Sequence, residues 1–228
     1  MSFPLIVVAF SIALHWSQST PAVAPPPSAV DPKAVAPAKS EWRDLFNGKD
    51  LDGWTPFLGV AGDPKLVWSV RDGVLVCGGK PTGYIRTTED FTNFELELEW
   101  RFDPKLGPGN SGVLLRLVGA DQVWPKSIEA QLESRSAGDI WNIGEFPMRA
   151  DASRTDGRHT AKANPTNEKP LGEWNKYSIR LDHGRLELRV NGEVQNVAEG
   201  CEVVPGKIGL QSEGAHIEFR RIRLRNLP

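Results

Sequence analysis

Alternation of apolar and polar residues is the dominant pattern along the chain. Segment 94–102, F-E-L-E-L-E-W-R-F, alternates over its whole length. Strand side chains point to opposite faces with a period of two, so one face of this segment is apolar. The other face carries Glu95, Glu97, Glu99 and Arg101. We interpret this charged row as a solvated outer face, whose charge also discourages edge-to-edge pairing of sheets.

Shorter segments of the same kind are separated by turn signals. Asp72-Gly73 and Asn191-Gly192 lie between apolar runs, as in two-residue β-hairpin turns. The last segment changes parity halfway, and a β-bulge near Arg220-Arg221 would turn all of its apolar residues toward the core. These residues are Ile217, Phe219, Ile222 and Leu224. The sequence predicts an all-β fold of about a dozen short strands, a two-sheet antiparallel sandwich or jelly roll.

Segment 128–133, I-E-A-Q-L-E, is the strand most informative about function. Its three apolar residues would enter the core, and Glu129, Gln131 and Glu133 would line the opposite face. In the preceding strand, Val113, Leu115 and Leu117 form an apolar row and Arg116 has the other parity. We therefore expect Arg116 to share a polar groove floor with the acid–amide row. The alternative is an ordinary solvated strand face on which Glu129 pairs with Arg116.

Residues 134–172 show no strand or helix period and are rich in Gly, Asp, Asn, Arg and Pro. Long irregular segments inside compact domains are uncommon and are usually functional or disordered. Because this one follows the polar row directly, we expect it to form a wall or lid over the groove. It contributes Trp141, His159 and Lys162 as candidate site residues.

The N-terminal part of the chain differs in composition from the rest. Residues 1–24 contain an apolar run and the small-x-small sequence Ala22-Val23-Ala24, which favours a secretory signal peptide, with an uncleaved anchor as the alternative. Residues 25–40 are rich in Pro and Ala, as in a linker. We expect one folded domain over 41–228, in a secreted or periplasmic protein, with membrane contact only through an uncleaved N-terminal segment.

Charge and cysteine content exclude some partners. With 27 basic and 29 acidic residues, the chain lacks the excess of positive charge that is typical of a nucleic-acid-binding protein. Cys77 and Cys201 are the only cysteines and cannot form a zinc site by themselves. They could form a disulfide in an exported protein or remain two buried thiols.

Six segments occur in the order known from one protein family. They are 45–54 (L-F-N-G-K-D-L-D-G-W), 110–116 (N-S-G-V-L-L-R), 128–133 (I-E-A-Q-L-E), 138–142 (G-D-I-W-N), 169–175 (K-P-L-G-E-W-N) and 206–214 (G-K-I-G-L-Q-S-E-G). Together they resemble the 3-keto-disaccharide hydrolase domain, long known as a domain of unknown function and abundant in secreted bacterial proteins. The resemblance implies a concanavalin A-like jelly roll with its ligand groove on the concave sheet. It also implies activity on 3-keto-glycosides, which a separate sugar 3-dehydrogenase would produce.

The ketone at C3 would make the C2 hydrogen acidic, so a base could remove it and the enolate could expel the C1 oxygen. Water would then add to the enone and complete a net hydrolysis. This route needs a base near C2, a group that stabilises the enolate oxygen, and an acid or water for the leaving group. Glu129 is the first candidate for the base, with His159 as an alternative, and Glu133 is the candidate acid.

The remaining polar candidates would bind substrate. Arg116 could hold the enolate or a hydroxyl group, and Asn110, Gln131 and Lys162 would contact hydroxyl groups. Trp141 would be a stacking platform for a sugar ring or, alternatively, an anchor of the long loop. Glu213 and His216 could reach the groove rim, although a structural role is expected for both.

Two other functional hypotheses remain open from the sequence. The E-x-Q-x-E row also resembles the E-x-D-x-E strand of retaining jelly-roll glucanases, but here Gln131 replaces the central Asp. The same fold could also serve as a non-catalytic carbohydrate-binding module. A divalent metal could assist the enolate, but no His, Asp and Glu residues have convincing ligand spacing, and no metal ligands are assigned.

Overall fold

A computed structural model of the chain describes residue 1 and residues 40–228. The expected signal peptide or anchor at 1–24 and nearly all of the linker at 25–40 lie outside the described residues. No helix within the described part is long and apolar enough to cross a membrane.

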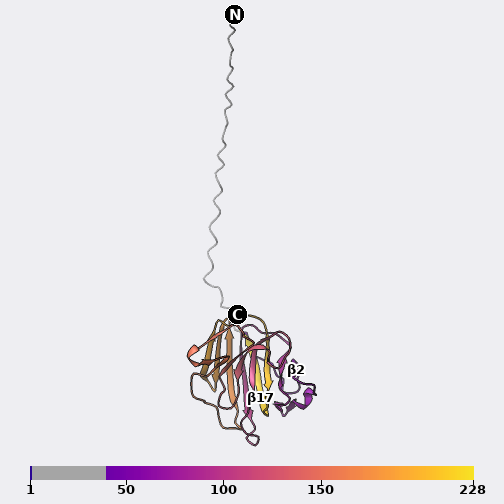
Figure 1. Ribbon diagram of the computed structural model, residues 1–228. Helices are drawn as coiled ribbons and strands as arrows, with labels where there is room; N and C mark the ends of the chain where they lie inside the picture. The colour runs from indigo at the N-terminus through magenta and orange to yellow at the C-terminus, as the bar shows by residue number, and fades with distance from the viewer. Residues whose placement is uncertain (2–39) are drawn as a thin grey trace. The chain divides into compact units, whose positions relative to one another are not determined.

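Residues 40–228 form two antiparallel sheets packed face to face (Figure 1). In spatial order, sheet A contains β10 (Arg149–Ala150), β15 (Glu193–Glu199), β14 (Arg185–Val190), β13 (Asn175–Asp182), β6 (Phe94–Phe102), β17 (Ile217–Asn226), β4 (Val74–Cys77) and β3 (Trp68–Arg71), with β1 (Arg43–Asp44) also paired to β17. Sheet B contains β11 (Thr155–Asp156), β12 (His159–Thr160), β9 (Ile140–Ile143), β8 (Lys126–Gln131), β7 (Gly112–Val118), β16 (Lys207–Ser212), β5 (Gly83–Thr87) and β2 (Trp54–Leu58). Two short 3-10 turns, η1 (Pro64–Leu66) and η2 (Ala152–Arg154), complete the described structure. The predicted two-sheet, all-β jelly-roll architecture is confirmed.

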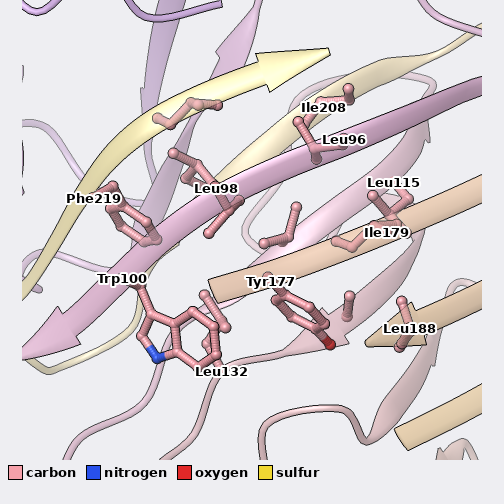
Figure 2. Close-up of a cluster of buried hydrophobic side chains, with 14 of the residues drawn as sticks. Leu96, Leu98, Trp100, Leu115, Leu132, Tyr177, Ile179, Leu188, Ile208 and Phe219 are labelled. Carbon is pink, nitrogen blue, oxygen red and sulfur yellow. The ribbon is translucent and has the colours of Figure 1, made fainter. Parts of the chain in front are cut away.

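The core lies between the two sheets and follows the predicted alternation. In Figure 2, Leu96, Leu98 and Trp100 of β6 share this core with side chains from both sheets. Trp100 also contacts the ring of Tyr177 on β13, with centroids 5.5 Å apart. Strand β6 spans Phe94–Phe102 with strictly alternating burial, as its sequence predicts.

The predicted turns are also present. Asp72 and Gly73 join β3 to β4, and Asn191 and Gly192 join β14 to β15, all four with positive φ. This left-handed backbone conformation is what a two-residue hairpin turn with right-handed strand twist requires. At the C-terminal strand, the register of β17 against β6 shifts between Arg220 and Arg223. The bulge keeps the four apolar residues of β17 in the core, which confirms the prediction for this strand.

The outer face of β6 is charged, as predicted, and its carboxylates are paired. Glu95 contacts Arg180 and Arg225 of the neighbouring strands. Glu97 has one cationic partner on β13 and one on β17, and both partners of Glu99 are on β17. This face of sheet A therefore carries a row of ion pairs at the protein surface. Each surface ion pair of this kind usually contributes little to the free energy of unfolding.

A second β-bulge changes the predicted orientation of Arg116. The register of β7 against β8 shifts between Leu115 and Val118, and Arg116 has a φ of 48°. Consequently Leu117 joins Leu114 on the outer face of sheet B, whereas the Arg116 side chain is completely buried. The expectation that Leu117 faces the core and that Arg116 lies on the groove floor was therefore wrong.

Residues 134–172 are more regular than the sequence suggests. They contain β9, β11 and β12, which extend sheet B beyond β8, and β10, which joins the edge of sheet A. Strand β9 was missed because its four residues are too short to show a period. Cys77 and Cys201 are both buried and both free, so the disulfide alternative does not hold in this structure.

Candidate functional site

A polar pocket of about 200 Å³ lies on the face of sheet B that points away from the core. Strand β8 runs through it, because Ile128, Ala130 and Leu132 are buried in the core and the intervening side chains point outward. The lining residues are Asn110, Trp124, Glu129, Gln131, Glu133, Trp141, Ile143, Arg158 and Glu213. The alternation in I-E-A-Q-L-E therefore locates the floor of the pocket.

Gly112 makes room for the polar groups at the bottom of the pocket. It lies on β7 between Gln131 of β8 and Gln211 of β16. A Cβ atom at this position would lie 2.4 Å from Glu129 Oε1 and 2.2 Å from Gln211 Oε1. The two side chains thus occupy the space above Gly112 that a side chain on β7 would otherwise fill.

Burial changes the acidity of Glu129. Only 4% of this residue is exposed, and the pKa of its carboxyl group is raised to about 8, chiefly by loss of hydration. The nearby charge of Glu213 contributes to this increase, whereas the Gln211 amide and the charge of Arg158 act in the opposite direction. The Gln211 amide lies close enough to favour the ionised carboxylate, but neither of its polar atoms is aligned to complete a hydrogen bond.

Glu213 forms the second acidic group of the pocket. Its pKa is raised to about 7, first by burial and then by the charge of Glu133, and is lowered by Arg158. Two carboxyl groups that titrate near neutral pH are a feature of catalytic sites, since both proton donation and proton acceptance are then accessible. Arg158 is the only cationic residue among those that line the pocket, and its charge acts on both acids.

The amide side chains are arranged to contact polar ligand atoms. Oε1 of Gln131 accepts hydrogen bonds from the main-chain N–H groups of Leu132 and Glu133, at 2.8 and 2.9 Å. These two hydrogen bonds fix the orientation of the Gln131 amide, and its NH₂ group remains available to donate to a ligand. Oδ1 of Asn110 is buried without a hydrogen-bond partner, and buried polar atoms of this kind are normally satisfied by water or ligand.

The Trp141 side chain contacts other residues of segment 134–172. Its ring stacks on that of His159, with centroids 4.6 Å apart, and the Arg158 guanidinium lies 5.2 Å from its centroid. His159 Nε2 contacts Oδ2 of the buried Asp139 at 2.8 Å. The main-chain N–H of Lys162 donates to Oδ1 of the same carboxylate.

The β7–β8 loop, residues 119–125, provides the remaining wall. Oδ1 of Asp121 accepts hydrogen bonds from the Tyr84 hydroxyl at 2.7 Å and from Nε of Arg86 at 2.9 Å. Val123 lies directly on Gly59, where a Cβ would be 2.4 Å from its Cγ2 atom. These contacts fix the loop across sheet B, and Trp124 follows them at the pocket with 40% of its surface exposed.

The structure brings together five of the residues expected from the sequence and separates three from them. Arg116, His159 and Lys162 do not line the pocket. The guanidinium of Arg116 is bound instead to main-chain carbonyls, and Nζ of Lys162 contacts the carbonyl of Arg135. His159 stacks on Trp141 and contacts Asp139. The residues brought together are Asn110, Glu129, Gln131, Glu133 and Trp141.

Several pocket residues were missed or given another role in the sequence analysis. Glu213 was expected to be structural, and Arg158 was only part of the proposed wall. A signal for Gln211 exists in the chain: Ile208 and Leu210 enter the core, so strand alternation places Gln211 on the face of Glu129. For Trp124 the chain offers no such period, because a loop residue has no fixed face.

Within residues 40–228, no group of three or more His, Cys, Asp and Glu side chains is placed to hold a metal ion. The groups that the pocket offers to a ligand are therefore carboxyl groups, amides, one guanidinium and indole rings.

Comparison with known proteins identifies relatives of this domain. A curated 3-keto-disaccharide hydrolase from Bacteroides thetaiotaomicron is 28% identical, with 80% of this chain and 77% of that protein covered. The crystal structure of a proposed glycosyl hydrolase from Parabacteroides distasonis ATCC 8503 matches with a TM-score of 0.61 and 23% identity, covering 82% of this chain and 94% of the other. A Bacillus licheniformis β-glucanase matches with a TM-score of 0.54 and 10% identity, over 85% of this chain and 100% of the other, and shows a likeness of fold alone.

The sequence model of one protein family, the 3-keto-alpha-glucoside-1,2-lyase-like domain, matches residues 41–225. These residues include every pocket residue. This is the family indicated by the six ordered sequence segments. The folded part of the chain is a carbohydrate-active, hydrolase-like domain, and the chain belongs to the family of 3-keto-alpha-glucoside-1,2-lyase-like domains.

Proposed function

We propose that this protein cleaves the glycosidic bond of 3-keto-glycosides by abstraction of the C2 proton and elimination of the C1 oxygen. The observation that carries the proposal is the buried Glu129 carboxyl group, with a pKa of about 8, beside the second acid Glu213. The family description names a 1,2-lyase on a 3-keto-glucoside, and the curated relative is named for hydrolysis of 3-keto-disaccharides. Both names fit the same first step.

In this mechanism the ionised Glu129 removes the C2 proton, and its high pKa makes it a strong base for a carboxylate. The transfer leaves a neutral carboxyl group in a buried position, where the neutral form is favoured. The negative charge moves to the ketone oxygen at C3. Arg158 and the NH₂ group of Gln131 are the groups in the pocket that stabilise this enolate.

Collapse of the enolate then forms the C1–C2 double bond and breaks the C1–O bond. The leaving oxygen takes its proton from water. Glu213, with its pKa of about 7, is partly protonated at neutral pH and donates a hydrogen bond to a hydroxyl group of the keto ring at the polar end of the pocket. Addition of water to C1 of the enone and protonation at C2 give the 3-keto-sugar, so that the net reaction is hydrolysis. No pair of carboxylates at the separation of a conventional glycosidase is required.

The proposal also concerns the origin of the substrate. A ketone at C3 requires prior oxidation of a glycoside, so an upstream sugar 3-dehydrogenase would supply it. The signal-like segment at residues 1–24 supports a secreted or periplasmic location for the reaction.

The decisive experiment is cleavage of a 3-keto-disaccharide and of its unoxidised parent by the purified chain in D₂O. Elimination followed by hydration places solvent deuterium at C2 of the released 3-keto-sugar, whereas direct hydrolysis at C1 retains the original hydrogen. The rate of spontaneous exchange is measured without protein. We expect cleavage of the keto form only, with deuterium at C2.

Glu129→Gln should lower kcat by about 10²–10⁴-fold, the usual contribution of a general base, while ligand binding persists. Glu173→Gln, on an exposed loop, is the matched control and should leave turnover unchanged. Cleavage of the unoxidised disaccharide would instead support a conventional glycosidase. Saturable binding without cleavage of either sugar would support a carbohydrate-binding module.

A further inference from the structure

Two tryptophans line the pocket, but their rings are available to a ligand to different degrees. The ring of Trp141 is stacked by His159 and approached by the guanidinium of Arg158. Trp124 is 40% exposed, and among residues 40–228 no aromatic or cationic side chain pairs with its ring. A large apolar surface exposed at a polar pocket commonly marks a contact with a ligand.

The pocket changes in polarity along strand β8. At one end, Gln131 and Glu133 lie at the end of the strand, together with Asn110 and Glu213. At the other end, Ile143 is paired with Ser127, next to the loop that carries Trp124. Glu129 lies between the two ends, paired with Trp141. A ligand with a polar reacting ring above Glu129 and beside Trp141 would therefore meet further apolar surface in the direction of Trp124.

The loop that carries Trp124 is fixed by its own contacts with β5 and Gly59. Asp121 connects its loop to Tyr84 and Arg86 on β5, and Val123 lies on Gly59. The hydrogen bonds from Arg86 also lower the pKa of Asp121, so its carboxyl group is ionised at neutral pH. A sugar ring that stacks on Trp124 therefore does not have to order this loop, which lowers the entropic cost of binding.

We propose that Trp124 is the stacking platform for the second sugar ring of a disaccharide substrate, the ring on the leaving side of the glycosidic bond. This inference rests on the proposed function, because the position of the bond is defined by the base Glu129. One face of a pyranose ring consists mainly of C–H groups, and such a face packs on an indole ring. Trp124 thus selects for disaccharides over glycosides with a small leaving group. The sequence had suggested Trp141 as a stacking platform for a sugar ring.

The test measures binding without turnover, using the full chain with Glu129→Gln as the parent. Calorimetry compares a 3-keto-disaccharide with the methyl 3-keto-glucoside, whose leaving group cannot reach Trp124. Adding Trp124→Ala should weaken disaccharide binding about tenfold and methyl glycoside binding less than about twofold, the size expected for one lost aromatic contact. Trp124→Phe should restore most of the affinity.

Trp174→Ala is the matched control, because the Trp174 ring contacts the guanidinium groups of Arg101 and Arg220, two residues of the charged outer face of sheet A. It should change neither affinity. The proposed role of Trp124 is contradicted if Trp124→Ala weakens the binding of both ligands equally or weakens neither. It is also contradicted if the parent shows no measurable binding of the disaccharide. These outcomes do not depend on catalysis, whereas the proposed function fails when the unmodified chain leaves the 3-keto-disaccharide uncleaved.

Discussion

At the bottom of the pocket, the Glu129 carboxyl group makes the stability of the protein depend on pH. Its pKa is about 8 in the folded protein, against an ordinary value of 4.5. Between these two values the folded state binds more protons at this group than the unfolded state does. The group's contribution to the free energy of unfolding is therefore complete below pH 4.5 and is lost as the pH rises through 8.

This linkage predicts that Glu129→Gln stabilises the protein at alkaline pH. At pH 9 the native carboxylate is ionised in a buried position, whereas the glutamine is neutral and has nearly the same shape. We expect the variant to melt at least about 2–4 °C above the parent at pH 9, the shift that corresponds to roughly 1 kcal/mol. At pH 5 both side chains are neutral and the difference in Tm should shrink. A difference that is equal at both values would show that ionisation is not its cause.

At the scale of single elements, strand alternation predicted which side of β8 faces the pocket. The same rule failed for β7, because Val113, Leu115 and Leu117 fit an unbroken alternation and nothing in that segment signals the bulge at Arg116. In β17 the bulge was predictable, since the apolar residues themselves change parity there. A bulge can thus be recognised from sequence only when it displaces apolar side chains from the core periodicity.

The contribution of residues 134–172 was predictable only in part. The polar segment does supply a wall of the site, through Trp141 and Arg158. Its β-structure was not predicted, because β9, β11 and β12 are two to four residues long and depend on hydrogen bonds to the edge of sheet B. Such short strands depend on contacts between residues that are distant in sequence. The local pattern of apolar and polar residues therefore does not predict them.

The arrangement of three neighbouring strands predicts the effect of a single methyl group. Gly112→Ala would place Cβ 2.2 Å from Gln211 Oε1 and 2.4 Å from Glu129 Oε1, so both side chains have to move. A displacement of the order of 1 Å in a reacting group can lower turnover by about 10²-fold. We expect such a loss of kcat for the 3-keto-disaccharide, in a protein that remains folded.

Gly62→Ala provides the control for that measurement. Its Cβ would meet the nearest atom, Leu58 Cδ1, at an ordinary 3.5 Å, and turnover should be unchanged. A Gly112→Ala protein with full activity would mean that Glu129 and Gln211 can leave the space above β7 without consequence. The proposed position of the base would then be incorrect.

For the molecule as a whole, Arg116 connects the two sheets at one end of the sandwich. It belongs to β7 of sheet B, and its guanidinium donates hydrogen bonds to the carbonyls of Thr92 at 2.8 Å, His183 at 2.7 Å and Cys201 at 3.3 Å, and also to that of Glu202. These carbonyls belong to connections between strands, and His183 lies in the turn between β13 and β14 of sheet A. Arg116 thus satisfies carbonyl groups that strand pairing leaves free.

Arg116→Met should therefore destabilise the whole domain without altering its chemistry. The methionine fills most of the volume but leaves buried carbonyls without donors, and a loss of about 3 kcal/mol or more is expected in urea unfolding. Arg116→Lys should not restore this stability, because one ammonium group cannot reproduce the fork of the guanidinium. At a temperature where the variant is still folded, kcat and KM for the 3-keto-disaccharide should match those of the parent. A selective rise in KM with unchanged stability would instead return Arg116 to the substrate-binding role that strand alternation first suggested.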